Sequence, residues 1–517
     1  MIGVIVKPGQ KPLVEEFFEL FKTPWEFYRP GSVYDVVVAT GDAMPSPMPL
    51  LFVRYSAAAE ASADGSPAAT TSRLGHVTII RAGFDLFEQV RLLLSQGQRL
   101  ERAHIPTLDV HIATLRRWIL EQGIPLVEIH PSPAAHDFAV CLTHDIDFVG
   151  IRRHVLDHTM WGFLYRSTVG GLYDAVRGRL PFGRLLKMWR AAASLPFVYA
   201  GWRPDFWEPF EWYLDVERGL PATYYLIPFK HRSGEKVSGR HAGRRGTAYD
   251  ISDVTESAAR LIAAGCEVGV HGIDAWHSVA SGRAEMARIA DATGGGRLGI
   301  RMHWLLRDQG TSAVLDQAGY AYDSTAGYNE TVGYRAGTTQ VFRPIGARAL
   351  LALPMHIQDG ALFYPQRLNL TEDEAEQRCQ VLIDHARQAG GVLTVLWHDR
   401  SHGPERFWGE FYQRLVAALR STNAWFGTGS QVVGWFRARR AVRFASPDAA
   451  DSGRVILRHH GDAISPALRV RIHRLSVDRR EELTEDVAWN GVTPLELDLW
   501  QSTASGHGTP RRAAAAR

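Results

Sequence analysis

Residues 138–147 read Phe-Ala-Val-Cys-Leu-Thr-His-Asp-Ile-Asp, and this stretch decides the fold. Its first six residues form a mostly apolar run, which is typical of a buried strand. Six further runs of this kind lie at 223–227, 266–270, 298–302, 320–322, 350–353 and 392–397. Helical patterns separate several of them, at 254–264, 311–318 and 371–388. Because parallel strands need crossover helices, this alternation predicts an α/β barrel or an open parallel sheet.

The pattern changes on both sides of this central unit, which we place at 135–440. Residues 1–134 show short apolar runs between helical patterns and predict a small α/β domain. Within that domain, 57–72 are rich in Ala, Ser, Thr and Gly and predict a surface loop. Residues 441–505 alternate apolar and polar residues and predict a small antiparallel β-rich appendage, and 506–517 predict a disordered tail.

The composition of the 517-residue chain is ordinary, with 45% hydrophobic residues, 22% charged residues and a net charge of +3. This balance is typical of a globular protein and argues against a nucleic-acid-binding surface. Three widely spaced cysteines provide neither a disulfide framework nor a cysteine-based zinc site. No basic segment followed by an apolar run begins the chain, and no apolar stretch reaches about 18 residues. We therefore expect a cytoplasmic protein without a transmembrane segment.

Residues able to bind a metal or move a proton follow five of the predicted strands. They are His144, Asp145 and Asp147; His271, Asp274 and His277; Arg301 and His303; Asp323; and His398 and Asp399. A single aspartate at a strand end is commonly a turn residue or a helix cap. Five polar endings together favour an active site, because parallel α/β folds build their sites at the carboxyl ends of the strands.

The residue types indicate metal-assisted hydrolysis. A carboxylate and two imidazoles leave an open coordination position for water, which is the pattern of a catalytic Zn²⁺ or a similar divalent ion. A second carboxylate can take a proton from that water, and a further histidine can protonate a leaving nitrogen.

Five motifs carry a resemblance to a known family. They are THDID at 143–147, EVGVHGIDAWH at 267–277, Arg301, YDSTAGYNETVGYRAG at 322–337 and VLWHD at 395–399. In order and spacing they resemble the polysaccharide deacetylases with the NodB-homology domain, carbohydrate esterase family four in the broad sense. This resemblance covers roughly 135–440 and implies a distorted (β/α)7 barrel that removes an N-acyl group, usually acetyl, from an amino sugar with the help of a metal.

The resemblance also implies roles for individual residues. Asp145 would be the general base, oriented by Arg301, and His398 would be the general acid. Asp147 and His271 would be metal ligands.

The chain departs from the family at the third ligand. The family usually places its two metal histidines at i and i+4, but position 275 is Ala and the next histidine is His277. Residues i and i+6 of a helix point to different faces, so His271 and His277 can share an ion only if the chain between them is a loop. We take His277 as the third ligand, with Asp274 and His303 as alternatives. The usual Arg-x-Pro is here Arg-Met-His at 301–303.

Aromatic and acidic residues beside the motifs supply candidate substrate contacts. Trp276 and Trp304 flank two motifs, and an aromatic face suits the apolar face of a pyranose ring, although such tryptophans are more often core residues. We add Asp323 and Asp359 to this set, and for Asp359 a role in a turn is an equal alternative.

Residues 151–190 form a basic insertion with eight basic and two acidic residues. A solvated pair of helices is one interpretation. The other is a lid that receives an anionic or lipid-linked glycan at a membrane surface.

The sequence as a whole predicts a metal-dependent N-deacylase, with Zn²⁺ as the first choice of metal. Its expected substrate is an amino-sugar glycan or its lipid-linked precursor. Alternatives are a deformylase or other small-amide hydrolase on the same fold, and a catalytically inactive glycan-binding module.

Overall fold

The central sheet is built around β8 (Phe138–Asp145), whose eight residues are all buried. The order of its strands is β13-β12-β11-β10-β9-β8-β15-β14, with β16 also beside β8, and all of these pairings are parallel. The strands are β9 (Ala222–Leu226), β10 (Glu267–Gly272), β11 (Gly299–Met302), β12 (Tyr322–Asp323), β13 (Leu351–Ala352), β14 (Ile357–Gln358), β15 (Val392–Leu396) and β16 (Ala424–Phe426). All seven expected runs contain a strand. The short strands β14 and β16 bring the sheet to nine strands in the described part of the chain, so the expected count of seven is not reproduced.

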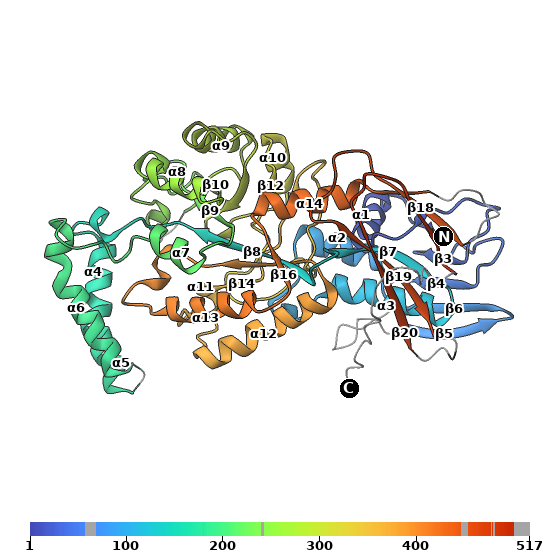
Figure 1. Ribbon diagram of the computed structural model, residues 1–517, viewed down its shortest axis with the longest axis horizontal. Helices are drawn as coiled ribbons and strands as arrows, with labels where there is room; N and C mark the ends of the chain where they lie inside the picture. Colours follow the sequence, from blue (N-terminus) through green and yellow to red (C-terminus); the bar gives the residue numbers. More distant parts are fainter. Residues whose placement is uncertain are drawn as a thin grey trace.

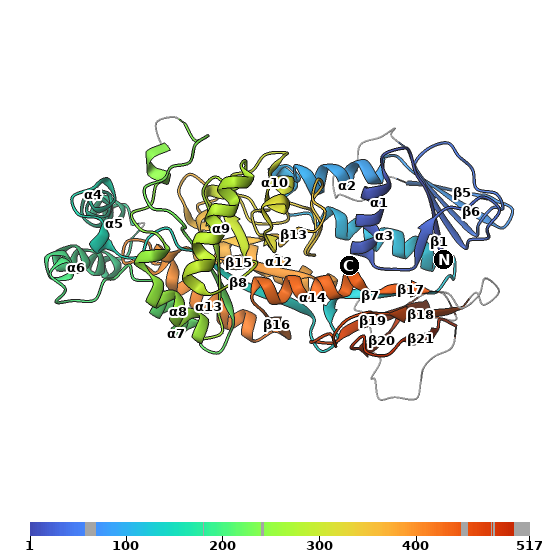
Figure 2. The same cartoon turned by 90° about the horizontal axis from the view of Figure 1, so that it is seen from above.

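The structure is a computed structural model, and it describes residues 1–56, 69–178, 180–238, 242–445, 453–476, 478 and 481–500. The molecule is elongated, with the central sheet between a helical arm at one end and two β-rich regions at the other (Figures 1 and 2). The sheet is curled, and helices flank it on both sides (Figure 1). These helices are α7 (Phe210–Val216), α8 (Thr255–Ala263), α9 (Val279–Thr293), α10 (Thr311–Ala318), α11 (Asp359–Phe363), α12 (Glu372–Ala389), α13 (Trp408–Arg420) and α14 (Gly429–Ala441).

The core of this unit comes from alternate residues of the strands, such as Leu142, Val270 and Ile300, packed against the helices. Helix α12 begins with a capping box in which Thr371 and Glu374 bind each other's backbone N–H groups.

The N-terminal sheet has the strand order β2-β1-β3-β4-β6-β5. Its strands are β1 (Ile2–Ile5), β2 (Trp25–Phe27), β3 (Val36–Ala39), β4 (Leu51–Tyr55), β5 (Ala69–Leu74) and β6 (Val77–Ala82), and its helices are α1 (Lys11–Phe21), α2 (Leu86–Ser95) and α3 (Thr107–Glu121). The pairings are parallel except for β5, which is antiparallel to β6. Of the loop expected at 57–72, 57–68 lie outside the described residues. The rest belongs to β5, so the loop prediction is wrong there.

The C-terminal region forms two three-stranded sheets, β17-β18-β21 and β20-β19-β7. Their strands are β7 (Leu126–Pro133), β17 (Arg443–Ala445), β18 (Arg454–Arg458), β19 (Leu468–Leu475), β20 (Glu482–Trp489) and β21 (Leu495–Asp498), and all the pairings are antiparallel. Strand β7 lies at the end of the expected N-terminal domain and pairs with β19. The sheet β20-β19-β7 therefore combines strands from the N-terminal domain and the C-terminal region. The expected boundaries near 134 and 440 stay predictions, and the tail at 506–517 lies outside the described residues.

The basic insertion and the residues that follow it, to position 203, form the helical arm, which projects from the end of the molecule opposite the N-terminus (Figure 1). It consists of α4 (His158–Tyr165), a π-helical turn (Arg166–Gly170), α5 (Gly171–Val176) and α6 (Phe182–Tyr199). Arg184 anchors α6 on the central unit, because its guanidinium lies 3.0 Å from Glu372 and 3.2 Å from Glu410. Arg179 lies outside the described residues. Among the helices of the described ranges, none is both long and apolar enough to cross a lipid bilayer.

Candidate active site

Two histidines come together at the carboxyl ends of β10 and β11. His271 lies opposite Arg301 in the parallel register, and His303 follows two residues after Arg301. Strand β11 ends at Met302, and His303 is the first residue of the 3-10 turn that follows. The ring centroids of His271 and His303 are 4.8 Å apart. The His271 Nδ1 lies 3.1 Å from the Arg301 carbonyl oxygen, so Nδ1 carries the proton and Nε2 keeps a free lone pair.

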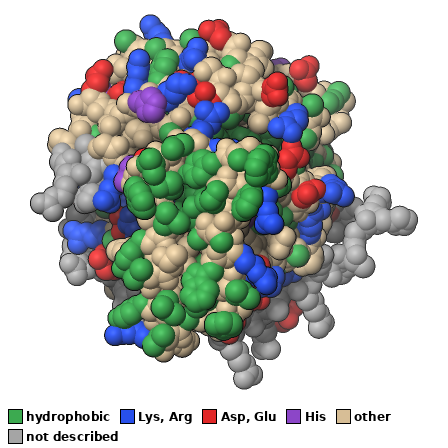
Figure 3. Space-filling view, turned by 90° about the vertical axis from the view of Figure 1, so that its left-hand side faces the viewer, with side chains coloured by type: hydrophobic (Ala, Val, Ile, Leu, Met, Phe, Trp, Pro, Cys, Tyr) green, Lys and Arg blue, Asp and Glu red, His purple; other side chains and the backbone are tan. Residues whose placement is uncertain are grey.

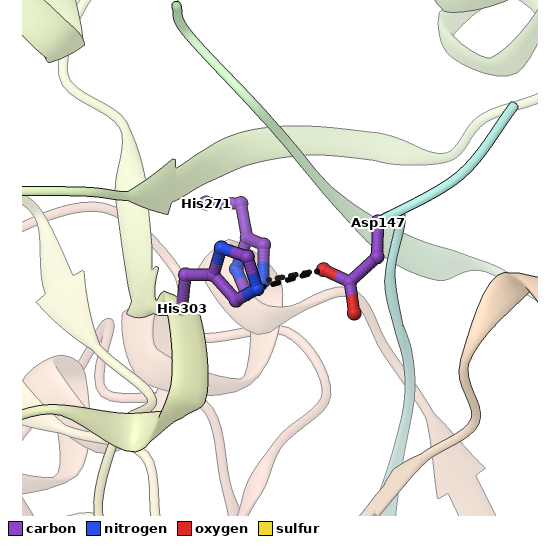
Figure 4. Close-up of side chains that lie close together, drawn as sticks. All are labelled: Asp147, His271 and His303. Atoms are coloured by element: carbon purple, nitrogen blue, oxygen red, sulfur yellow. Dashed lines mark ion pairs between the residues drawn. The ribbon is translucent and has the colours of Figure 1, made fainter. Parts of the chain in front are cut away.

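Asp147 faces both rings from the loop after β8 (Figure 4). Its Oδ1 lies 3.3 Å from the His271 Nε2 and 3.4 Å from the His303 Nε2. This oxygen is buried and accepts no hydrogen bond. The backbone N–H of Asp147 donates to Asp399 Oδ1 at 3.0 Å, which fixes the loop.

The three residues fit a divalent metal ion. Ligand atoms about 2.0–2.1 Å from a tetrahedral zinc ion are about 3.3–3.4 Å apart, which matches the spacing between this oxygen and the two nitrogens. Burial lowers the pKa of His303 to about 3, so its ring is neutral, as a metal ligand must be. Burial alone would raise the pKa of Asp147, but His303 and His271 hold it below its usual range. Asp147 is therefore an anion between two imidazoles.

His277 does not join this group, and His303 takes the place expected for it. The His277 Nε2 lies 3.1 Å from Asp274 Oδ1, and the same oxygen accepts the Glu235 N–H at 2.9 Å. The chain turns after β10 because Glu285 accepts the N–H groups of Ile273 and Asp274, at 2.9 and 2.7 Å. This turn pairs Asp274 with His277 and keeps both away from the three-residue group.

Arg301 holds Asp145 by a buried ion pair. Its Nη1 lies 2.9 Å from Asp145 Oδ1 and 2.8 Å from Thr143 Oγ1, and its Nη2 donates to Ser324 Oγ at 2.8 Å. The guanidinium lies over the Tyr225 ring, 4.5 Å from its centroid. Burial would lower the pKa of Arg301, but Asp145 raises it overall. The carboxylate is thus fixed at the sheet edge by a permanent cation.

His398 is held by Asp359 at the end of β15. The His398 Nδ1 lies 2.6 Å from Asp359 Oδ1, and Asp359 Oδ2 accepts the His398 N–H at 2.9 Å and the Ser401 hydroxyl. Burial alone would lower the pKa of His398, but Asp359 raises it to about 10. His398 is therefore a cation at neutral pH. Asp359 is fully buried with both oxygens occupied, so the structure replaces its expected substrate contact by a contact with His398.

The remaining expected substrate contacts differ in their surroundings. Asp323 accepts the N–H of Thr325 at 2.9 Å and also its hydroxyl, and it lines a small cavity with Leu94 and Arg307. Asp323 is not part of the three-residue group, and its role as a substrate contact stays a prediction. Trp304 is 41% exposed, and its ring centroid lies 5.8 Å from that of His303. Trp276 is partly buried, with the Lys236 ammonium 5.5 Å from its ring centroid.

Two further motif residues, His144 and Asp399, received no individual role from the sequence. His144 is buried between the Trp397 carbonyl oxygen at 3.0 Å and Glu217 Oε1 at 2.8 Å, so it is a core residue. Asp399 is buried beside Asp147, and its Oδ2 accepts no hydrogen bond. Burial and the Asp147 charge raise the pKa of Asp399 to about 7. Its position directly after His398 was the signal that could have identified it.

Three comparisons with known proteins were made, and only the one with solved structures gives matches. No family model matches the chain, and no curated protein sequence matches it. Solved structures do match. A protein from Mycobacterium smegmatis named as a polysaccharide deacetylase is 17% identical over 60% of this chain and 96% of its own, with a TM-score of 0.35. One from Pseudomonas aeruginosa, also named as a polysaccharide deacetylase, is 15% identical over 60% and 94%, with a TM-score of 0.36. Puue allantoinase is 14% identical over 59% and 92%, with a TM-score of 0.36.

Proposed function

We propose that this chain is a metal-dependent N-deacylase that hydrolyses the amide of an N-acylated amino sugar in a surface glycan or its precursor. One observation carries this proposal. Asp147, His271 and His303 turn their ligand atoms toward one point at the carboxyl edge of a parallel sheet, and an oxygen of Asp147 there lacks any hydrogen-bond donor. Asp145 and His398 lie at the ends of neighbouring strands of the same sheet.

The metal ion is held by Asp147, His271 and His303, and Zn²⁺ suits this donor set best. A divalent ion in such a site polarises an amide carbonyl and lowers the pKa of a water molecule. Everything else in the reaction is done by side chains of the chain itself.

Asp145 takes the proton from the attacking water. Its carboxylate is held in place by Arg301 at 2.9 Å, so the base does not have to be oriented during the reaction. The water oxygen forms a bond to the amide carbon, and the bond between this carbon and nitrogen then breaks.

His398 supplies the proton that the leaving nitrogen needs. Asp359 binds its Nδ1, so Nε2 is the nitrogen that donates. The immediate products are the free amine of the sugar and a carboxylic acid. Water gives one proton to Asp145 and leaves the other on the acid, and the nitrogen gains its proton from His398. The acid then ionises in water, and transfer of the Asp145 proton to His398 through solvent restores both groups.

The partly exposed ring of Trp304 offers an apolar platform beside the metal group, which suits a pyranose ring. The alternative of an inactive glycan-binding module was motivated by the missing histidine at position 275. His303 offers a third ligand atom beside Asp147 and His271, which supports the deacylase over this alternative.

The proposal is tested with the purified full chain loaded with zinc. An N-acetylglucosamine oligomer is the first substrate, formamide is the second, and released carboxylate is measured together with metal content. We expect acetate release that Asp145→Asn lowers by about 10²-fold or more with the metal retained. The exposed Asp373→Asn is the matched control and leaves the rate unchanged. Hydrolysis of formamide but of no acetylated sugar would replace the proposal by a small-amide hydrolase, and a chain that binds no metal would overturn it.

A further inference from the structure

The helical arm carries large apolar side chains that the described part of the chain leaves exposed. Tyr165, Val176, Phe182 and Trp202 are between 63% and 80% exposed. Further exposed apolar side chains of the arm are Val155, Leu156, Trp161, Val169, Leu172, Tyr173, Trp189 and Phe197. Scattered apolar residues are normal on protein surfaces, but a continuous group of this size marks a binding surface.

These side chains gather on one face at the end of the molecule. Figure 3 views the molecule from that end and shows a broad hydrophobic area with Lys and Arg side chains along its edges. Between α5 and α6 the surface is hollowed by a cavity of about 540 Å³, lined by Thr168, Val169, Leu172, Trp189, Ala192 and Ala193. This lining carries no charge, so it suits a hydrocarbon chain.

The charge of the arm is positive, and part of it is free to act on a partner. Arg184 and Lys187 are committed to Glu410 on the central unit, and Arg153 is committed to Asp253. Arg177 is exposed, and its guanidinium lies 4.4 Å from the centroid of the exposed Tyr173 ring. Arg190 is also exposed but lines a cavity on the other side of α6, together with Glu208 and Glu211.

One of the two acidic residues of the insertion, Asp157, is already paired within the arm. The Asp157 carboxylate caps the N-terminus of α4 by accepting the N–H groups of Thr159 and Met160, both at 2.9 Å. It also pairs with His154 at 2.7 Å. Asp174 is the second acidic residue of the insertion. The partner that complements the face is therefore both apolar and anionic.

We propose that the outer face of α4, α5 and α6 binds the surface of an anionic lipid bilayer. Trp and Tyr side chains are enriched at membrane interfaces because their rings are apolar and their edges are polar. Apolar burial from one face of helices that lie on the membrane, together with attraction of Arg to anionic headgroups, is sufficient for reversible binding. Apolar contacts supply most of the affinity, because Arg184 and Lys187 are occupied by the central unit.

The base of the arm lies next to the candidate metal site. Phe148 follows Asp147 in the chain, and its ring centroid lies 5.2 Å from that of His154. The Arg400 guanidinium lies 4.0 Å from the centroid of the same Phe148 ring. Docking would thus bring the site near the headgroups, where a lipid-linked glycan is accessible. This consequence rests on the proposed function, whereas bilayer binding itself does not.

The test is sedimentation of the full chain with vesicles of phosphatidylcholine alone or mixed with phosphatidylglycerol in equal parts. An apolar variant combines Tyr165→Ser, Val176→Ser, Phe182→Ser and Trp202→Ser. A charge variant carries Arg177→Gln. The matched control combines Val33→Ser, Leu74→Ser and Val492→Ser, whose side chains are 61–83% exposed at the other end of the molecule.

We expect the unmodified chain to bind the anionic vesicles more tightly than the neutral ones. The apolar variant should lose at least tenfold in partitioning, and the charge variant about fivefold at low salt. The control variant should bind as the unmodified chain does. All variants should keep the far-ultraviolet circular dichroism of the unmodified chain, which separates lost binding from lost folding.

Three results would overturn the proposal. The unmodified chain could stay in solution with both kinds of vesicle, or the control variant could lose as much binding as the apolar variant. Light scattering could instead show a dimer that the apolar variant converts to monomer while no vesicle binds. The face would then be an interface between two copies of the chain. Activity on a soluble acetylated oligomer should be the same in all variants, so failure of membrane binding stays distinguishable from failure of the proposed function.

Discussion

Two parts of the same sheet edge use histidine in opposite ways. At the end of β10 and β11, His271 and His303 face the Asp147 oxygen that accepts no hydrogen bond. At the end of β15, the His398 ring is hydrogen-bonded to Asp359, whose second oxygen accepts the Ser401 hydroxyl. Burial lowers the pKa of His303 to about 3, whereas Asp359 raises the pKa of His398 to about 10.

The difference lies in the carboxylate and not in the histidine. Asp359 makes a short hydrogen bond with one imidazole, so the pair is stable as a cation and an anion. Asp147 presents one oxygen to two buried imidazoles, and a divalent ion satisfies all three groups. One end of the edge therefore suits a metal, and the other end suits a proton donor.

The largest effect is expected at the third ligand. His303→Ala removes one of the three donors, so we expect loss of zinc and a fall in turnover of about 10³-fold or more, because metal stabilisation is worth several kcal/mol. Metal content by atomic absorption and turnover of an acetylated oligomer measure both effects.

The matched control is His277→Ala, which removes a histidine paired with Asp274 at 3.1 Å. It should keep the zinc and most of the activity. The opposite pattern, with zinc lost from the His277 variant and kept by the His303 variant, would contradict the arrangement at this end of the edge.

The second effect is expected at the other end. His398→Gln removes the proton donor but none of the three metal-group residues, so turnover should fall by about 10²- to 10⁴-fold while the zinc content stays the same. A purified variant assayed for both quantities is sufficient. If the metal were lost along with activity, His398 would belong to the metal group and the contrast between the two ends would disappear.

Much of this edge could be predicted from the sequence. The strands that carry the site were visible as apolar runs, and each predicted run contains a strand. The family resemblance implies that Arg301 orients Asp145, and the Arg301 Nη1 lies 2.9 Å from Asp145 Oδ1. The two residues meet because parallel strands bring their carboxyl ends to the same edge of the sheet. Motifs on long buried strands are predictable because the strand itself fixes the direction of the side chains.

The turns were not predictable in the same way. The choice between His277 and His303 depends on Glu285, which binds the turn after β10 from helix α9. Likewise, Asp359 reaches His398 only because β14, a strand of two residues, lies beside β15. Contacts of this kind depend on tertiary structure, and no local pattern in the sequence encodes them.

A third prediction sharpens the contrast through pH. A raised pKa of about 10 keeps His398 protonated through neutral pH, so activity should fall only as pH rises through about 10. Asp359→Asn removes the anion that raises this pKa, which should return toward the ordinary value of about 6.5. The alkaline limb of the pH profile of kcat/KM should therefore shift to lower pH, and kcat/KM at about pH 8 should fall about 30-fold.

The stability of the native protein should also fall at alkaline pH, because protonation of His398 is linked to folding. Because the folded pKa of His398 is raised, its ion pair stabilises the native protein below the ordinary histidine pKa, and this stabilisation is lost as pH rises through about 10.

Ser401→Ala is the control for the pH profile of kcat/KM, because it keeps the Asp359 carboxylate. Its alkaline limb should stay close to that of the unmodified chain. An unmoved limb in Asp359→Asn would show that another group sets the alkaline pKa.

The smallest effect is expected for the ring that adjoins the metal end. Trp304 has a positive φ of 65°, so Trp304→Asn is the suitable change, because Asn tolerates this backbone conformation. If the exposed ring stacks on the sugar, the loss should be about 0.5–1.5 kcal/mol, which is a rise in KM of about two- to tenfold with kcat and zinc unchanged. The exposed Trp202 of the arm gives the control, since Trp202→Asn should leave the KM for a soluble oligomer unchanged. Loss of zinc in the Trp304 variant would instead mean that this residue positions His303. Trp304 would then belong to the metal site, although it is not itself a ligand.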